Sequence, residues 1–129
     1  MAQRTILGAQ HPNTLACMSN LATLLGAQGE PGKAEPLYLE VLASERATLG
    51  SQHPSTFISI CNLGMVLEKQ GKLREAEALF SEALTGRWRV LGRAHPGTQA
   101  ACTALVRVLT RQGKARDARE VKAQYGARK

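Results

Sequence analysis

The sequence predicts an all-α fold in which helical hairpins stack into a solenoid. The first observation is an internal repeat: LGAQHPNTL at residues 7–15 returns as LGSQHPSTF at 49–57 and as LGRAHPGTQ at 91–99, each time after 42 residues. The second is that apolar residues after each His-Pro pair recur at i, i+3 and i+4, as on the buried face of an amphipathic helix. A fixed period of this length is typical of repeat proteins, whose units pack only on their neighbours.

The repeat divides the chain into four parts. Residues 9–50, 51–92 and 93–129 are three copies, and AQRTILG in residues 1–8 matches SERATLG at 44–50. We therefore expect residues 1–8 to be the remnant of a preceding second helix, and the chain to be part of a longer array. The third copy is more polar than the others, as a capping repeat at the end of a solenoid must be.

The first helix of each copy is bounded by a proline and a glycine. Proline is suited to the first turn of a helix, where its missing N–H costs nothing, and glycine can take the left-handed conformation that ends one. The expected starts are Pro12, Pro54 and Pro96, and the expected stops are Gly29, Gly71 and Gly113.

A second amphipathic helix follows in each copy and completes a helical hairpin. In the first two copies it runs from Ala34 or Ala76 to a closing Leu-Gly pair. The first copy carries Pro31 and Pro36, from which we expect its second helix to start late. Trp88 stands where the first copy has Arg46, so we expect it at an outer or inter-repeat surface.

These motifs resemble those of a known family. The second copy resembles the tetratricopeptide repeat (TPR) signature through Ile60, Leu63, Gly64, Leu67, Ala76 and Phe80. The 42-residue period and the LGxxHPxT, NLA and QGKxxEAE strings are similar to the kinesin light chain subgroup in particular. The resemblance implies a right-handed superhelix whose first helices line a concave groove, and a non-catalytic scaffold that binds a peptide or helix of a protein partner.

The resemblance also indicates which residues line that groove. An asparagine before Leu-Ala or Leu-Gly often holds the backbone of the ligand in this family, and Asn20 and Asn62 match that position whereas Ala104 does not. The same helical face then includes Thr23, Met65, Lys69, Arg107 and Arg111. An amide both donates and accepts hydrogen bonds, and guanidinium groups bind carboxylates, so we expect an acidic, extended ligand. The alternatives are an intra-repeat hydrogen bond for the asparagines and a solvated face for the arginines.

The net charge of +7 is concentrated in the third copy. Residues 93–129 hold nine basic and two acidic side chains, whereas residues 9–50 hold two basic and four acidic ones. A basic end raises the alternative of a nucleic-acid-binding surface in the third copy, but Tyr125 is the only aromatic residue there that could stack on bases. A third alternative is a structural segment that contacts only its own array. We expect a protein partner rather than nucleic acid.

No pattern indicates catalysis, a metal or a cofactor. His11, His53 and His95 recur, but equivalent residues on packed helices lie roughly 8–10 Å apart, too far to share a zinc ion. We expect them to mark the turns between repeats instead. The three cysteines form no CxxC pair and suit reduced thiols.

The sequence also bears on location and self-association. No apolar run approaches the roughly 18 residues of a membrane span, so we expect a cytoplasmic protein without membrane contact; the resemblance to kinesin light chains implies an association with the cytoskeleton. If a preceding helix is missing, the first hairpin has an apolar end face, and we expect weak end-to-end self-association through Leu7, Leu15 and Met18.

Overall fold

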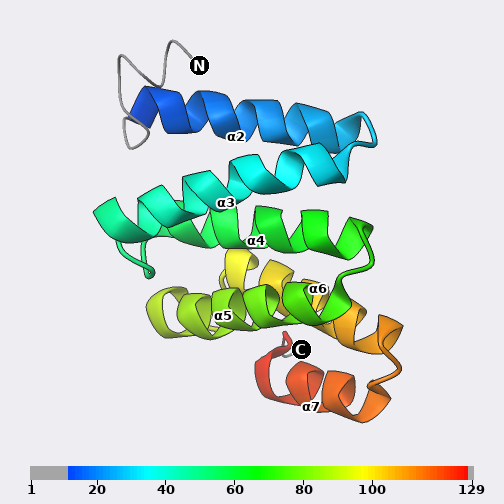
Figure 1. Cartoon of the computed structure of the whole chain (residues 1–129). Coiled ribbons are helices and arrows are strands. Elements are labelled where there is room, and N and C mark those ends of the chain that lie inside the picture. The colour runs from blue at the N-terminus through cyan, green and yellow to red at the C-terminus, as the bar shows by residue number, and fades with distance from the viewer. Residues whose placement is uncertain (1–11, 128–129) are drawn as a thin grey trace.

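The chain forms a stack of helices joined by short turns (Figure 1). The computed structural model describes residues 12–127, and within them every regular element is an α-helix. The helices are α2 (Pro12–Ala27), α3 (Pro31–Thr48), α4 (Pro54–Lys69), α5 (Leu73–Leu91), α6 (Pro96–Arg111) and α7 (Ala115–Tyr125). Each helix packs mainly on the helix before it and the helix after it, so α2 and α7 lie at the two ends of the part of the stack that the structure describes. The predicted all-α stack of hairpins is confirmed.

The helix boundaries follow the predicted punctuation. α2, α4 and α6 start at their prolines, and Gly29, Gly71 and Gly113 follow their ends with φ values of 80°, 79° and 79°. The imidazoles of His53 and His95 cap α4 and α6, because their Nδ1 atoms accept from the backbone N–H groups two residues on, at 3.1 and 2.9 Å. These two histidines therefore mark the turns, as predicted, while His11 lies outside the described residues.

The expected late start of the second helix in the first copy is wrong. α3 begins at Pro31, which is equivalent to the first residue of α5, Leu73. Pro31 occupies the first turn, where no N–H is needed. Pro36 lies further inside α3 and is exposed, so it forfeits one backbone hydrogen bond to Gly32 without burying an unpaired group.

The core runs through the whole stack and depends on close helix packing within the second repeat. Gly64 of α4 faces the ring of Phe80 of α5, and a Cβ atom at Gly64 would lie 2.9 Å from that ring. Ile60 and Leu84 are also almost fully buried in this core. A small residue at position 64 is therefore what lets the aromatic side chain lie between the two helices.

At the first junction between repeats, polar side chains connect the second helices and the turns. Glu35 of α3 accepts hydrogen bonds from Gln70 Nε2 at 2.7 Å and Lys72 Nζ at 3.1 Å. Arg46 of α3 forms two hydrogen bonds to the carboxylate of Glu82 in α5, at 2.6 and 2.8 Å. Two separate ion pairs therefore bridge the first and second repeats.

The second junction repeats one of these contacts and replaces the other. Glu77 of α5 accepts from Gln112 Nε2 at 2.8 Å and Lys114 Nζ at 3.1 Å, 42 residues beyond the first set. In place of the arginine pair, Trp88 packs edge-on against Tyr125 of α7, with ring centroids 5.0 Å apart. Trp88 therefore lies at an inter-repeat surface, in agreement with its predicted position.

The apolar end face at α2 is formed by other residues than those predicted. Met18 is only 2% exposed and packs inside the first hairpin, and Leu15 is half-buried. Leu7 lies outside the described residues. The exposed apolar side chains of α2 are instead Leu21 and Leu24, at 41% and 53%. The predicted residues lie on the face of α2 that packs on α3, and the exposed stripe lies to one side of that face.

Candidate functional site

Two adjoining hollows lie across the first helices of the three repeats. One, of about 260 Å³, is lined by residues of α4 and α6: Met65, Glu68, Lys69, Arg107 and Arg111. The other, of about 210 Å³, is lined by residues of α2, α3 and α4: Thr23, Gly26, Ala27, Tyr38, Asn62, Met65, Val66 and Lys69. They share Met65 and Lys69, so they form one continuous surface, which we call the groove.

Six of the seven predicted site residues line the groove. They are Thr23, Asn62, Met65, Lys69, Arg107 and Arg111. The helical periodicity brings them together, since residues three and seven positions after each asparagine lie on the same face of a helix. The structure therefore places side chains from three repeats around Met65 and Lys69.

Asn20 is not among the groove residues. It is exposed on α2 and lines a separate hollow of about 480 Å³, where α2 and α3 meet the start of α4. Its neighbours there include Ser19, Ile58 and Ser59. The two asparagines occupy equivalent places in their repeats, but only Asn62 faces the hollows that contain the cationic residues.

The two arginines of the groove share one carboxylate. Glu68 Oε2 and Oε1 accept from Nε and Nη2 of Arg107, both at 2.8 Å, and Oε2 also accepts from Nη1 of Arg111 at 3.1 Å. The side chain of Glu68 is 10% exposed, whereas the side chains of Arg107 and Arg111 are 47% and 49% exposed. A buried anion therefore holds two half-exposed cations at the surface of α6.

Electrostatics keeps this cluster charged at neutral pH. The hydrogen bonds from Arg107 hold the pKa of Glu68 below its usual value although burial acts in the opposite direction, and the bond from Arg111 lowers it further. The hydrogen bond to Glu68 likewise raises the pKa of Arg107. One negative charge faces two positive ones, so the cluster keeps a net positive charge.

The other half of the groove has little charge. The single hydroxyl proton of Thr23 is donated to the carbonyl of Ser19 at 2.9 Å, so the hydroxyl of Tyr38 donates to Thr23 at 2.7 Å. Gly26 has no side chain and Ala27 has a small one, so the surface beside them is recessed. Lys69 projects from α4 between the two halves, and no ion pair joins it to another described side chain.

Sequence reasoning missed Glu68, and it placed Tyr38 in the packing between helices but not at the groove. Glu68 belongs to α4 and forms hydrogen bonds to the two arginines of α6. The sequence feature that points to this contact is a difference between the copies at three positions. Where the third repeat has Arg107 and Arg111, the second has Met65 and Lys69, and an acidic residue appears in α4 at the adjacent turn. Tyr38 is the aromatic position of the first repeat, equivalent to Phe80, and its hydroxyl reaches Thr23 at the groove.

The described residues also bear on metal binding, thiol reactivity and membrane insertion. Among residues 14–127 no group of three or more His, Cys, Asp or Glu side chains could hold a metal ion. Burial raises the pKa of the Cys61 and Cys102 thiols, which favours the unreactive protonated form. In the described part of the chain, no helix is both long and apolar enough to cross a membrane.

Comparison with solved structures gives close fold matches. A crystal structure of a Podosopora anserina protein with kinesin light chain nearly identical TPR-like repeats superposes with a TM-score of 0.90 at 29% identity. The match covers 96% of the present chain and 59% of that one. BtubC from P. vanneervenii matches with a TM-score of 0.75 at 18% identity, over 95% of the present chain and 52% of its own. The TPR domain of Arabidopsis FLU matches with a TM-score of 0.74 at 23% identity, over 86% and 90%.

Sequence comparison identifies the family. A comparison with curated protein sequences gives no match. The family model of the tetratricopeptide repeat matches residues 1–44, 27–87 and 62–125, which together span nearly the whole chain. The chain spans a little under three fifths of the Podosopora anserina protein that it resembles. It therefore belongs to the tetratricopeptide repeat family and is of the kinesin light chain-like type.

Proposed function

We propose that the chain binds an acidic, extended segment of a protein partner in the groove, and that it does so without catalysis. TPR repeats are in general protein-interaction modules, and the fold and family of this chain are those of such a module. The observation that carries the finer proposal is the convergence of Asn62, Lys69 and the two arginines on hollows that meet at Met65.

The groove offers different contacts along its length. Asn62 can donate to and accept from a ligand backbone, because an amide has both functions. Met65 provides an adaptable apolar surface at the centre. Lys69 and the arginines supply charge-assisted hydrogen bonds to carboxylates, which are stronger than bonds between neutral groups.

The arginines can bind a ligand without leaving Glu68. Arg107 uses Nε and Nη2 for Glu68, and its Nη1 hydrogens remain available. Arg111 uses Nη1, so its Nε and Nη2 hydrogens remain available. Glu68 thus reduces the entropy that the arginines lose when they bind a carboxylate, because they are already held in position.

The nucleic-acid alternative receives less support. Several cations of the third repeat already have acceptors within the chain: Arg93 donates to the carbonyls of Gln124 and Gly126, and Lys114 bonds to Glu77. Tyr125 packs against Trp88 and is not a free stacking surface. These contacts therefore favour a protein partner over nucleic acid.

A peptide array graded in Asp and Glu content tests the proposal. Lys69→Glu combined with Arg111→Glu should weaken binding of the acidic peptides by at least about tenfold, since each lost charge-assisted bond contributes about 1.5–3 kcal/mol before competition from water. The matched control is Arg89→Glu with Arg116→Glu, two exposed arginines outside the groove. Equal damage from both pairs, or single-stranded RNA that displaces the peptide, would contradict the groove assignment.

A further inference from the structure

The exposed stripe on α2 occupies positions that are buried in the other two repeats. Leu21 and Leu24 are 41% and 53% exposed. Their counterparts are Leu63 and Val66 in α4, at 3% and 5%, and Leu105 and Val108 in α6, at 5% and 0%. In those repeats the second helix of the preceding repeat covers the stripe, since α3 packs on α4 and α5 packs on α6. The stripe on α2 is therefore a surface shaped to receive a second helix.

Beside the stripe, the charge pattern of α2 is inverted relative to the other repeats. At both internal junctions a glutamine and a lysine donate to a glutamate of the preceding second helix. The equivalent positions in the first repeat are Gln28 and Glu30. The lysine is thus replaced by an acid, which requires a cation on the surface that docks there. We call Leu21, Leu24, Gln28 and Glu30 the head face.

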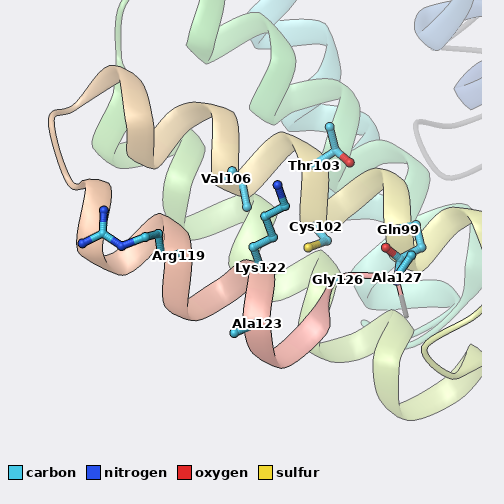
Figure 2. A pocket seen from close by; sticks show the side chains of 9 residues that line it. All are labelled: Gln99, Cys102, Thr103, Val106, Arg119, Lys122, Ala123, Gly126 and Ala127. Carbon is cyan, nitrogen blue, oxygen red and sulfur yellow. The ribbon is translucent and has the colours of Figure 1, made fainter. Parts of the chain in front are cut away.

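The opposite end of the stack has the complementary inversion. The residue of α7 that is equivalent to Glu35 and Glu77 is Arg119. It lines a hollow of about 650 Å³ between α6 and α7, together with Cys102, Val106 and Lys122 (Figure 2). Lys122 stands where Phe80 fills the second repeat, and Figure 2 shows its side chain extending between Val106 and Cys102. We call Arg119, Lys122 and this hollow the tail face.

We propose that the head face of one copy of this chain docks on the tail face of a second copy, so that the stack continues from molecule to molecule. In the register of the internal junctions, Leu21 and Leu24 lie over the hollow, and Glu30 meets Arg119. Gln28 also fits, because its amide oxygen can accept from a guanidinium as readily as the NH2 groups of Gln70 and Gln112 donate to carboxylates at the internal junctions.

Charge complementarity favours a second copy as the occupant. The first repeat has an excess of acidic side chains, and the third has a large excess of basic ones. Among the described residues, the ion-pair partner of Glu30 is the exposed Lys33, at 2.9 Å in the same turn, and such pairs contribute little. Lys122 can keep its ammonium group in water while its methylene chain covers the incoming leucines.

This contact is head-to-tail, so it does not close on a dimer. One copy leaves a free head and its neighbour a free tail, and such heterologous contacts build open chains of subunits. The head and tail faces share no residue with the groove. Self-association and peptide binding can therefore succeed or fail independently.

Sedimentation velocity of the intact chain and of two blocked variants tests this proposal. Leu24→Glu blocks the head, and Arg119→Glu with Lys122→Glu blocks the tail; all three side chains are exposed, so circular dichroism should show unchanged helicity. The native chain should form species that grow with concentration beyond a dimer, up to the millimolar range. Each blocked variant alone should remain monomeric. Their mixture should give dimers and nothing larger, because one intact head meets one intact tail.

Charge exchange gives a second test of the register. Glu30→Arg alone should weaken association at least about fivefold, because an attractive pair becomes a repulsive one. Glu30→Arg with Arg119→Glu in the same chain should restore it. Val90→Glu and Arg116→Glu, on exposed residues outside both faces, are the matched controls and should associate as the native chain does.

Three results would overturn the proposal. The first is a native chain that remains monomeric at millimolar concentration. The second is a tail-blocked variant that still dimerises, which indicates a head-to-head contact. The third is a charge exchange that fails to restore association, in which case Glu30 and Arg119 do not meet.

Discussion

At the first junction between repeats, Arg46 of α3 binds the carboxylate of Glu82, whereas at the second junction the same position is Trp88, which packs on Tyr125. The arginine pair is partly solvated, with side chains 32% and 36% exposed. The tryptophan instead receives the guanidinium of Arg93 over its ring, 4.6 Å from the centroid. The contact starts from the same position of the earlier second helix at both junctions, but its chemistry and the position of its partner differ.

The replacement of the arginine pair by aromatic packing matches a difference between the second helices that the two junctions connect. α5 has 19 residues and a broad buried face, but α7 has 11 residues and only Ala118 is fully buried in it. Arg93 also donates to the carbonyls of Gln124 and Gly126, where α7 ends. We infer that the aromatic cluster around Trp88 provides much of the packing that fixes the short last helix, whereas Arg46 adds to a junction that the core already holds.

The largest expected effect on stability comes from the core of the second repeat, which lies between the two junctions. Phe80 is 1% exposed and fills the space left by Gly64, so Phe80→Ala should lower the free energy of unfolding by about 3–5 kcal/mol. Lys122→Ala, at the equivalent and exposed position of the third repeat, should change it by less than about 0.5 kcal/mol. Urea denaturation followed by circular dichroism measures both. If both substitutions lowered the free energy of unfolding by a similar amount, the second and third repeats would not differ in packing at this position.

A smaller effect compares the two junctions directly. Trp88→Ala should cost about 2–3 kcal/mol, less than for a fully buried aromatic residue because Trp88 is half-buried. Arg46→Ala should cost about 0.5–1 kcal/mol, since partly exposed ion pairs contribute little. Hydrogen exchange should show faster opening of α7 in the first variant and no local change in α7 in the second. An equal cost of the two substitutions would remove the distinction between the junctions.

The helix pattern was predictable because its signals are local. A proline opens each first helix and a glycine with positive φ follows its end, and both effects act within a few residues. The start of α3 differs from the prediction because Pro31 occupies the favourable first turn and does not break the helix. Local sequence rules therefore predicted the helices, and they failed only at the start of α3, where the position of the proline within the first turn matters.

The sequence predicted which face of each first helix forms the candidate site, but it did not predict which side chains from other helices contact that face. Spacing along one helix gathers Asn62, Met65 and Lys69, and the repeat transfers that face to the neighbouring helices. The offset between helices is a property of the packed stack. For that reason helical spacing alone did not reveal that Glu68 reaches Arg107, or that Asn20 lies in a separate hollow.

The smallest expected effect concerns the contact that the two junctions have in common. Hydrogen bonds from Gln70 to Glu35 and from Gln112 to Glu77 are the main reason that the pKa of each glutamate is lowered. A carboxyl group with a lowered pKa in the folded state stabilises the fold above its unfolded pKa, and this contribution is lost as the pH falls through the folded value. Both junctions should therefore weaken in the acid range, below the ordinary glutamate pKa.

Because the two contacts are equivalent, their removal should have equal effects. Glu35→Gln and Glu77→Gln should each cost about 0.5–1 kcal/mol at pH 7, a small value since these side chains are partly solvated. Each should also reduce the loss of stability between pH 7 and the acid range, as measured by urea denaturation at several pH values. Glu75→Gln, on an exposed residue of α5, is the control and should leave the pH dependence unchanged. If only one of the two substitutions lowers the stability, the same sequence motif contributes differently at the two junctions. The contribution of the shared contact would then depend on its surroundings, which contain Arg46 at the first junction and Trp88 at the second.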